Sequence, residues 1–383
     1  MLKLTFLGTS AGVPTKQRNV TALAIECLNP YLVGSSRQQD KNKSNNKNSK
    51  SRPWLLIDCG EGTQHQLLHT KLSLHQLHVI CITHVHGDHC YGLPGLLASA
   101  AMSGRTAPLI LIAPKAIATL LDAVISTTEL HFPFAINFMA IEDLLSEPDS
   151  KNKAQVTISL DNQHQLEIDI TLLSHRVASY GFGITQIISR RSLNTDKLVA
   201  DNIPASELWG KLQQGQDVMT ADGRKLRSAD YVDNESQLTR VVVAGDNDTP
   251  ERLQAAVIGA DVLVHEATYT SDVLAKIQAK NPDFDLMHSS AQLLGRFAEQ
   301  VGVRNLIMTH FSVRYQSFDN PISSTPNMAH IRLESESVYQ GNLWLAHDFA
   351  QYMVNGSADL ADLAGETESG SVQYLGSARD HNN

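Results

Sequence analysis

The sequence predicts an α/β fold in which two β-sheets are covered by helices, an αββα sandwich. Short apolar runs typical of strands alternate with helix-like runs along most of the 383 residues. In the middle of the chain, strand-like runs follow one another without an obvious helix between them, as antiparallel strands do. The second half then repeats the alternation of the first. These observations favour two sheets covered by helices over a single all-parallel sheet.

The individual elements follow from the spacing of apolar residues and from the residues that end each run. The first runs are apolar and end in glycine, polar residues or histidine, which predicts strands at 2–8, 20–27, 54–60 and 79–84. Helix-like patterns at 91–104 and 114–127 lie on either side of a strand at 109–114. Later elements are expected at 134–141, 165–175, 179–188, 240–246, 261–268, 305–311 and 341–354 as strands, and at 290–301 as a helix.

The composition divides the chain into one domain and two atypical segments. Residues 34–53 are rich in Ser, Asn and Lys and almost free of apolar side chains, which predicts a disordered surface insertion. A basic loop that contacts RNA is the alternative for this insertion. Residues 355–383 are polar and rich in Gly and Ser, so a flexible C-terminal tail is expected there. The remainder, 1–354, is long enough for a single large α/β domain.

Charge and cysteine usage restrict the classes of function. The net charge of -9 and the pI of about 5.9 argue against a protein that coats nucleic acid by bulk attraction. An RNA-directed role would therefore need local basic features or metal ions. The four cysteines all lie in the first quarter of the chain without a C-x-x-C pair, which suits free thiols in a reducing cytosol. No segment has the length of a signal peptide or a membrane span, so we expect a cytoplasmic protein.

The most informative stretch is "VICITHVHGDHC", which follows an apolar, strand-like run. Imidazole and carboxylate groups are ligands for zinc and similar divalent ions. His84 and His86, two residues apart, could share one metal, and Gly87 permits a tight turn that directs Asp88 and His89 towards a second. A chance cluster in a surface loop is the weaker reading. The stretch therefore predicts the core of a dinuclear metal site.

Three further candidate ligands follow later strands. His175 ends "ITLLSH", Asp246 ends "VVVAGD" and His310 ends "NLIMTH". Each taken singly is more often a structural residue, and Asp248 in "GDNDTPE" is an alternative to Asp246. Asp246 is preferred because it directly follows the strand. The order H-x-H-x-D-H, H, D, H resembles the metallo-β-lactamase superfamily.

The late part of the chain contains no thiolate ligand, because no cysteine follows Cys90. Asp246 instead offers a hard oxygen that could bridge two metals. A metal pair roughly 3.5–4 Å apart activates water and stabilises both the attacking and the leaving oxygen of a phosphodiester. Hydrolysis of a phosphate ester is therefore the expected chemistry.

Several stretches resemble one branch of this superfamily, the ribonuclease Z family of tRNA 3'-processing endonucleases. The matching stretches extend from Phe6 to Tyr315 and cover most of the chain. They are "FLGTSAGVPTKQRN", "LLIDCGEGTQHQLL", "THVHGDHCYGLPGLL", "SHRVASYGFGI", "VHEATY", "MHSS" and "THFSVRY". The resemblance implies a metallo-β-lactamase fold with a protruding flexible arm.

The same resemblance assigns roles to individual residues. It implies two zinc ions per chain, one bound by His84, His86 and His175, the other by Asp88, His89 and His310, with Asp246 as the bridge. Asp88 would also accept a proton from the attacking water, and His288 would donate one to the leaving oxygen. His265 and Glu266 would orient ligands through hydrogen bonds. Considered without the resemblance, His288 is better explained as a neighbour of a helix N-cap. For His265, a purely structural role as a buried residue at a strand end is nearly as good an explanation as the orienting role.

The resemblance also implies where RNA binds. Lys16 and Arg18 in "PTKQRN" and Arg314 in "HFSVRY" would contact the substrate, although each could be an ordinary surface residue. The segment 191–232 lies where the family has its tRNA-binding arm, but "IPASELWGKL" lacks the Gly-Pro usual there. "MHSS" is a further small departure, because the family has His-Ser-Thr. Precursor tRNA and a second copy of the chain, in a homodimer, are the expected partners.

The function that these features predict is zinc-dependent removal of the 3' trailer from precursor tRNA. Metal-activated water would attack a phosphodiester and leave a tRNA 3'-hydroxyl and a 5'-phosphorylated trailer. One alternative is another hydrolase of the same fold, such as a phosphodiesterase or an arylsulfatase. A second alternative, from a different class, is a non-catalytic RNA-binding subunit, which the complete ligand set disfavours.

Overall fold

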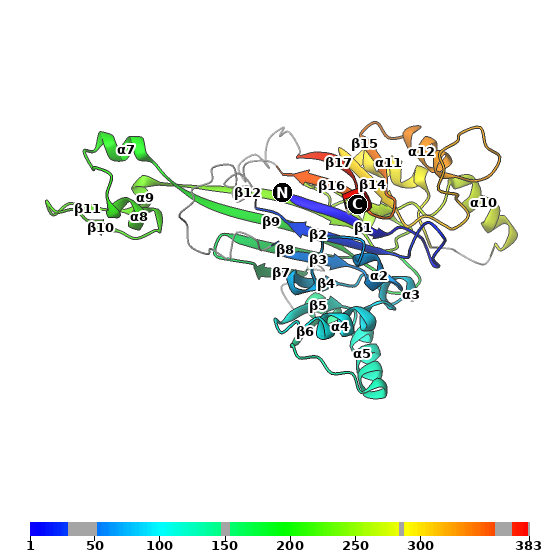
Figure 1. Cartoon of the computed structure of the whole chain (residues 1–383). Coiled ribbons are helices and arrows are strands. Elements are labelled where there is room, and N and C mark those ends of the chain that lie inside the picture. The colour runs from blue at the N-terminus through cyan, green and yellow to red at the C-terminus, as the bar shows by residue number, and fades with distance from the viewer. Residues whose placement is uncertain (30–51, 147–153, 283–286, 357–369, 382–383) are drawn as a thin grey trace.

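Two β-sheets pack face to face, and helices cover the outer face of each sheet (Figure 1). The computed structural model describes residues 1–29, 52–146, 154–282, 287–356 and 370–381. Most of the predicted insertion at 34–53 lies outside these residues. The layers are those of the predicted αββα sandwich.

The first sheet has eight strands, in the order β17-β16-β1-β2-β3-β4-β5-β6. Neighbours from β17 to β3 are antiparallel, whereas β3, β4, β5 and β6 are parallel. Helices occur between several of the parallel strands, because a parallel pair needs a crossover connection. The strands are β1 (Leu2–Gly8), β2 (Ala22–Cys27), β3 (Trp54–Ile57), β4 (Leu77–Cys81), β5 (Leu109–Ala113), β6 (Ile136–Ala140), β16 (Ala350–Asn355) and β17 (Ser371–Ser377).

The second sheet has seven strands, in the order β15-β14-β13-β12-β9-β8-β7. Strands β7, β8, β9 and β12 form an antiparallel meander, and β12 to β15 are parallel. This meander is the run of strands that the middle of the sequence predicts. The strands are β7 (Ala154–Ser159), β8 (His164–Leu172), β9 (Tyr180–Leu193), β12 (Val232–Val243), β13 (Val262–Glu266), β14 (Asn305–Thr309) and β15 (Asn342–Leu345).

Burial on both faces explains why the central strands have almost continuous apolar sequences. In β12, Val241 and Val243 face the core between the two sheets, while Val242 faces the outer helices. In β3, Leu55 and Ile57 point between the sheets and Leu56 points outward. The two-residue period of a strand thus supplies apolar side chains to two separate cores.

Helices on each outer face complete these cores. On the first sheet, α4 buries Leu93, Leu96 and Leu97, while α5 buries Ile117 and Leu121. On the second sheet, α11 and α12 provide the corresponding apolar contacts. The helices are α2 (Thr63–Leu67), α3 (Gly87–Cys90), α4 (Leu93–Met102), α5 (Lys115–Thr128), α6 (Ile141–Ser146), α10 (Ser271–Lys280), α11 (Ala291–Val301) and α12 (Met328–Glu336). Among the described residues, no helix is both long and apolar enough to cross a membrane.

The C-terminal region differs from its prediction in two respects. The single strand expected at 341–354 is two strands, because "AHDF" separates β15 in the second sheet from β16 in the first. The tail predicted to be flexible contains β17, which pairs with β16 from Ala350↔Ser377 to Asn355↔Ser371. Without β17, strand β16 would be an edge strand with unpaired backbone groups. The "VQYL" of β17 has the residue types that favour pairing with such an edge.

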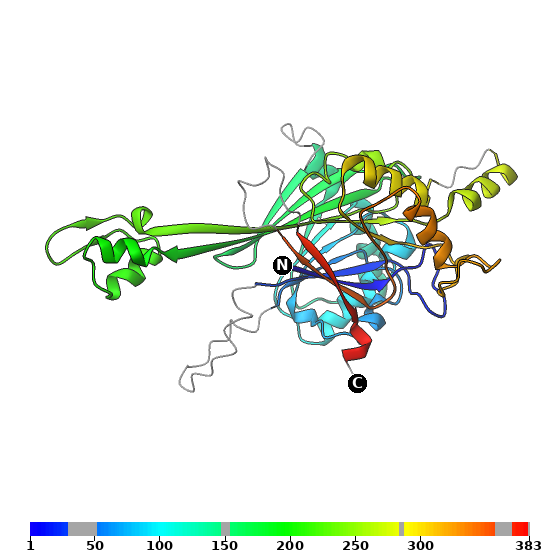
Figure 2. The ribbon, with the colours of Figure 1, turned by 90° about the horizontal axis from the view of Figure 1, so that it is seen from above.

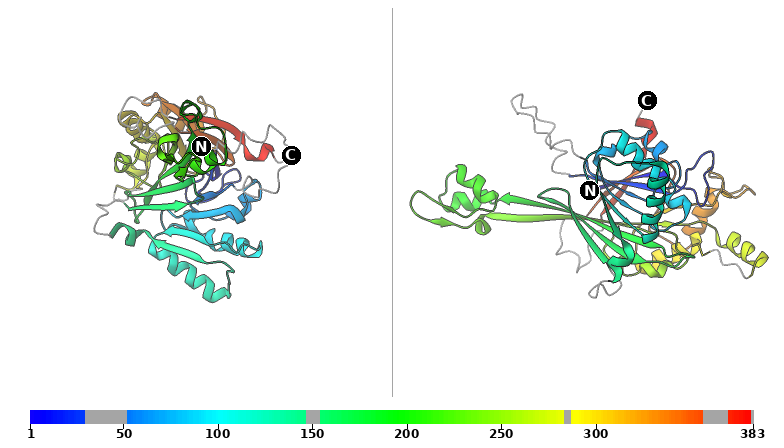
Figure 3. Two further views of the ribbon diagram at one scale, coloured as in Figure 1. Left: turned by 90° about the vertical axis from the view of Figure 1, so that its left-hand side faces the viewer. Right: turned by 90° about the horizontal axis from the view of Figure 1, so that it is seen from below.

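The predicted arm projects far from the body (Figure 2). Its two strands, β9 and β12, stay paired from Phe182↔Val243 to Leu193↔Val232. The tip carries the short elements α7 (Thr195–Ala200), α8 (Glu207–Gln213), β10 (Val218–Met219), β11 (Lys225–Leu226) and α9 (Ser228–Tyr231). These bury a small apolar cluster of their own, which includes Leu198, Leu212 and Tyr231. Figure 3 shows the arm end-on in its left view and in profile in its right view.

Candidate metal centre

The candidate ligands lie in loops that follow strands of both sheets. The "THVHGDHC" loop leaves β4 of the first sheet, and α3 within it carries Asp88 and His89. His175 follows β8, Asp246 follows β12 and His310 follows β14, all in the second sheet. These three strands run in the same direction, so their carboxyl ends meet at one edge. The site therefore forms where the edges of the two sheets come together.

The seven predicted ligands divide into two groups around one shared carboxylate. In each group the potential ligand atoms all lie within 4.8 Å of one another. The groups are His84, His86, His175 and Asp246 on one side, and Asp88, His89 and His310 on the other. A third, overlapping combination is Asp246, His288 and His310. The first two groups are the ones that the resemblance implied.

Asp246 faces both groups with different oxygens. Its Oδ2 lies 3.7 Å from Nε2 of His84 and 3.7 Å from Nε2 of His175. Its Oδ1 lies 3.4 Å from Nε2 of His89 and 3.3 Å from Nε2 of His310. The carboxylate is 3% exposed, so it needs positive partners. This arrangement is the one that a bridging ligand requires.

The ring nitrogens that face away from the centre have partners of their own. Nδ1 of His89 lies 2.7 Å from Oδ2 of Asp58, and Nδ1 of His175 lies 2.8 Å from the carbonyl oxygen of Met287. Nδ1 of His84 lies 3.0 Å from the hydroxyl of Thr83. Such contacts fix the ring orientation and leave Nε2 for a metal.

The inward-facing nitrogens approach one another closely. Nε2 of His84 lies 3.1 Å from Nδ1 of His86, and Nε2 of His89 lies 3.3 Å from Nε2 of His310. Converging imidazoles and carboxylates are the donor set that zinc and related divalent ions prefer. The residues therefore fit a pair of such ions.

The electrostatics of the centre match this chemistry. Burial alone would raise the pKa of Asp246, but the imidazoles of His310, His89 and His84 outweigh it and hold the pKa well below its usual range. Burial, together with the neighbouring His89, lowers the pKa of His84. Burial would lower the pKa of His89, but Asp246 and the other neighbouring carboxylates outweigh burial and raise the pKa well above its usual value. An ionised Asp246 and a neutral His84 are in the state that metal binding needs, whereas a metal bound at His89 would displace its proton.

His288 lies beside the ligand groups and contacts a buried carboxylate. Its Nδ1 lies 2.9 Å from Oε2 of Glu266 and 3.8 Å from Oδ2 of Asp246. Burial would lower the pKa of His288, but the charge of Glu266 outweighs burial and raises the pKa to about 9. The side chain keeps 18% of its surface exposed. His288 can therefore be a proton donor that substrate can reach.

Glu266 and His265 support this region in different ways. The backbone N–H of Asn247, next to Asp246, donates to Oε1 of Glu266 at 2.7 Å. The hydroxyl of Thr268 donates to Glu266 and lies 3.0 Å from Nδ1 of His310. His265 contacts the side-chain amide of Asn247 at 3.0 Å and no predicted ligand directly. Glu266 thus contacts His288 directly and reaches His310 through Thr268. His265 contacts the ligands only indirectly, through Asn247.

No role was predicted from the sequence for several of these supporting residues. Asp58 accepts hydrogen bonds from the backbone N–H and the hydroxyl of Thr83, and its backbone is left-handed with φ 60°. The only signal was its place directly after the apolar "WLLI" run. Thr83 and Thr268 gave no signal, because their contacts depend on the tertiary fold.

The three predicted substrate-binding residues have different environments. Lys16 and Arg314 are exposed. Arg18 is 5% exposed, and its guanidinium donates to the carbonyl oxygens of Ser312 and Tyr315 at 3.2 and 2.7 Å. This position argues against the predicted direct contact of Arg18 with substrate, because its donors already hold two loops together.

Asp248, the alternative to Asp246, belongs to neither group of candidate metal ligands. Its N–H donates to the carbonyl oxygen of Ser174, and its carboxylate accepts from the Thr249 hydroxyl.

Fold and site together define a metallo-β-lactamase-fold hydrolase. Human tRNase Z, short form, covers 91% of this chain and 98% of its own with a TM-score of 0.55 at 22% identity. The metallo-β-lactamase fold protein YhfI from Bacillus subtilis covers 91% and 97% with a TM-score of 0.52 at 15% identity. The family model described as Anti-Pycsar protein Apyc1 matches residues 28–202, less than half of the chain.

Curated relatives then show the family. A ribonuclease Z from Marinobacter nauticus is 42% identical over 351 residues, which are 92% of this chain and 96% of the relative. A ribonuclease Z from Pseudomonas putida is 44% identical over the same shares of both chains. The chain belongs to the ribonuclease Z family and is an endoribonuclease of the tRNase Z type.

Proposed function

We propose that this enzyme removes the 3' trailer from precursor tRNA by hydrolysing one phosphodiester at the candidate metal centre. The observation that carries the proposal is Asp246, whose two oxygens face two separate sets of histidines. Membership of the ribonuclease Z family supports the substrate class. The proposed products are a tRNA 3'-hydroxyl and a 5'-phosphorylated trailer.

We propose zinc as the metal and two ions per chain. His84, His86 and His175 would hold one ion, Asp88, His89 and His310 the other, and Asp246 would bridge them. When bound, such a pair would lower the pKa of water and neutralise charge on the phosphodiester.

Two side chains of the protein, Asp88 and His288, would take part in the proton transfers. Asp88 accepts the backbone N–H of Gly12 at 2.7 Å through Oδ2, so the carboxylate is oriented. The imidazoles of His89 and His310 outweigh the effect of burial and hold the pKa of Asp88 below its usual range. Asp88 would therefore stay ionised and orient the attacking water. Its role as acceptor of the water's proton is taken from the family resemblance, because a depressed pKa by itself makes a carboxylate a weaker base. His288, kept protonated by Glu266, would donate a proton to the leaving oxygen.

The direct test is incubation of the purified protein with a precursor tRNA, with and without a chelator, followed by mapping of the product ends. The proposal expects one cut at the start of the trailer, which the chelator abolishes and added zinc restores. Binding of the RNA without any cut would favour the non-catalytic subunit. Hydrolysis of sulfate esters or cyclic nucleotides but not of precursor tRNA would favour another hydrolase.

Metal content is the first specific prediction. Protein purified without chelator is expected to contain close to two divalent ions per chain by elemental analysis, because two ligand groups share Asp246. Replacing His86 by Ala should lower the content towards one ion, since only one group loses a ligand. Full activity in protein that contains no metal would rule out the assignment.

A second prediction concerns the contact between Glu266 and His288. An acid must be protonated, so activity should fall as pH rises through the pKa of His288, which Glu266 raises to about 9. Glu266→Gln removes that charge and should move the alkaline limb of the kcat–pH profile to lower pH. Metal content is measured in parallel, because Glu266 also contacts Asn247 and Thr268. An unmoved alkaline limb in a fully metal-loaded variant would contradict the assignment of His288.

A homodimer and a cytoplasmic location remain predictions from the sequence. Sedimentation of the purified protein tests the first and fractionation of cells tests the second. Lys16 and Arg314, both exposed, remain the proposed contacts to RNA near the centre, and the arm remains the proposed contact to the body of the tRNA.

A further inference from the structure

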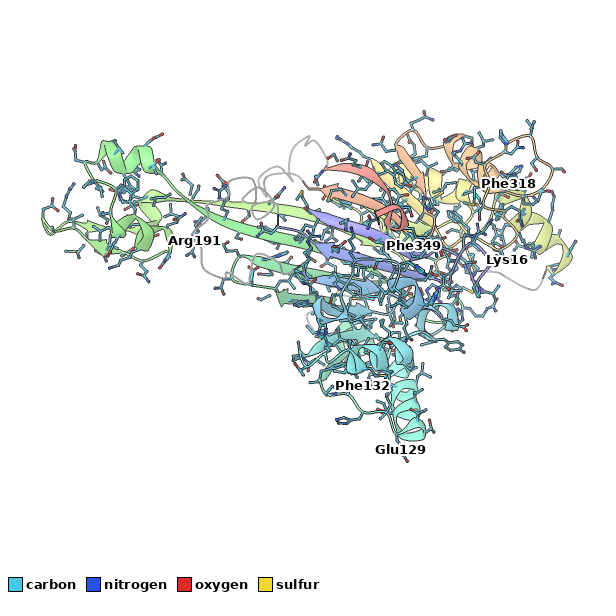
Figure 4. The ribbon with its side chains drawn as sticks, in the orientation of Figure 1. Lys16, Glu129, Phe132, Arg191, Phe318 and Phe349 are labelled. Carbon is cyan, nitrogen blue, oxygen red and sulfur yellow. The ribbon has the colours of Figure 1, made fainter. Side chains whose placement is uncertain are left out.

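A pocket of about 440 Å³ lies between the "TKQRN" loop and the C-terminal end of the chain. The loop contributes Lys16 to its lining, and the C-terminal segment contributes Ser377 and Arg379. Lys16 and Phe349, which also lines the pocket, are labelled in Figure 4. None of the metal-centre residues is part of this lining, so the pocket is a separate feature.

The C-terminal segment holds Arg379 firmly at the pocket. Strand β17 pairs with β16, and the N–H of Ala378 donates to the carbonyl oxygen of Phe349 at 2.8 Å. The guanidinium of Arg379 then stacks over the ring of Phe349, 4.1 Å from its centroid. Stacking of this kind restrains a planar guanidinium while its N–H donors remain at the edges.

The charge balance of the pocket is positive. Its one lining carboxylate, Asp348, accepts hydrogen bonds from the Thr9 hydroxyl, the Asn19 N–H and the Gln66 amide at 2.7–2.9 Å. The buried Arg18 lies near enough to offset the charge of Asp348. Lys16 and Arg379 are both exposed, and neither forms an ion pair with a carboxylate whose side chain the structure describes.

The pocket and the metal centre share one loop. The N–H of Gly12 donates to Asp88 in the centre, and the N–H of Asn19 donates to Asp348 in the pocket. An extended chain advances at most about 3.6 Å per residue, so these two contacts are no more than ~25 Å apart. One strand of duplex DNA carries a phosphate about every 3.4 Å of helix axis, so a span of this length corresponds to roughly seven phosphates.

We propose that this pocket binds a backbone phosphate of the RNA substrate, with Arg379 and Lys16 as the groups that contact its oxygens. The inference rests on the proposed function, because it assumes an RNA that reaches the metal centre. A stacked arginine presents parallel donors that match phosphate geometry, and Lys16 adds a point charge. The C-terminal segment thus becomes part of the substrate-binding surface.

The test compares Arg379→Ala with Arg304→Ala in the full-length, metal-loaded enzyme. Arg304 is also exposed but precedes β14, at the end of that strand opposite His310, so it controls for the loss of one charge. Arg379→Ala should raise KM for precursor tRNA about fivefold or more. It should also reduce the log–log salt slope of binding by about 0.7–0.9, the value of one phosphate contact. Hydrolysis of bis(p-nitrophenyl) phosphate should not change, whereas Arg379→Lys should keep the salt slope.

Three outcomes would overturn the inference. The first is an Arg379→Ala enzyme that matches Arg304→Ala in KM and salt slope while wild type cuts precursor tRNA. The second is an equal loss on both substrates by Arg379→Ala and Arg379→Lys with a lowered Tm, which would make Arg379 a folding residue. The third is a rise in Tm with inorganic phosphate that Arg379→Ala removes without any change in tRNA affinity, which would make free phosphate the ligand. Wild type that does not cut precursor tRNA would instead refute the proposed function.

Discussion

Replacing Asp246 by Ala is expected to abolish cleavage of precursor tRNA and to lower the metal content of the enzyme. Its two oxygens face two sets of imidazoles, so one substitution removes a ligand from both proposed ions. Loss of a group that merely orients a ligand typically costs about 10–100-fold. Loss of a shared ligand should exceed that range, and kcat and bound metal are the quantities to measure.

Asp248→Ala is the matched control, because it removes a carboxylate two residues away. Asp248 accepts from the Thr249 hydroxyl and lies outside both ligand groups. We expect this variant to keep its metal and most of its activity. A dead Asp248→Ala enzyme beside an active Asp246→Ala enzyme would show that the bridging ligand has been misassigned. Thermal melting of both variants identifies any loss that comes from unfolding.

The candidate ligands could be recognised because their signals are local in the sequence. Four candidates lie within six residues, and His175, Asp246 and His310 each follow shortly after an apolar run. The structure then places β8, β12 and β14 in one sheet with the same direction, so the residues that follow these strands converge at one edge, opposite the loop that leaves β4 of the other sheet. The structure brings these residues together in two groups.

The supporting contacts could not be predicted in the same way. Asp58 and His89 are 31 residues apart, and Thr268 and His310 are 42 apart, so nothing in the local pattern connects them. Arg18 shows the opposite problem. Its loop has the composition of a solvated turn, yet tertiary packing buries the guanidinium against two carbonyl groups.

The fold shows a similar division between local and tertiary information. Alternation of strands and helices predicted the layers, because each central strand buries both faces. The assignment of strands to sheets depends on contacts between distant residues, so β15 and β16 were expected as one strand and lie in different sheets. The composition of 355–383 suggested a tail, but a free edge at β16 orders β17.

The arm tip is expected to contribute to tRNA binding and not to the chemistry. Joining Leu193 to Val232 by a short turn would delete 194–231, and the pairing of these two residues in register should let the rest of β9 and β12 fold unchanged. The tip buries its own cluster around Leu198, and it carries no proposed ligand. The deletion should therefore weaken precursor tRNA binding while hydrolysis of bis(p-nitrophenyl) phosphate stays largely intact.

The charges of the arm determine how its salt dependence should change. Residues 191–232 contain six basic and six acidic side chains, so bulk attraction is not expected to drive tRNA binding. Arg224 and Lys225 form ion pairs with Asp222 and Asp217, whereas other exposed basic residues, such as Lys211, could contact phosphate. Each lost phosphate contact should flatten the slope of log binding constant against log salt concentration by about 0.9, the value for a double-stranded nucleic acid. Lys211→Ala in the intact arm should therefore reproduce part of the change. Equal loss of activity on tRNA and on the small substrate would mean that the tip supports the body of the enzyme, and its assignment to tRNA binding would be wrong.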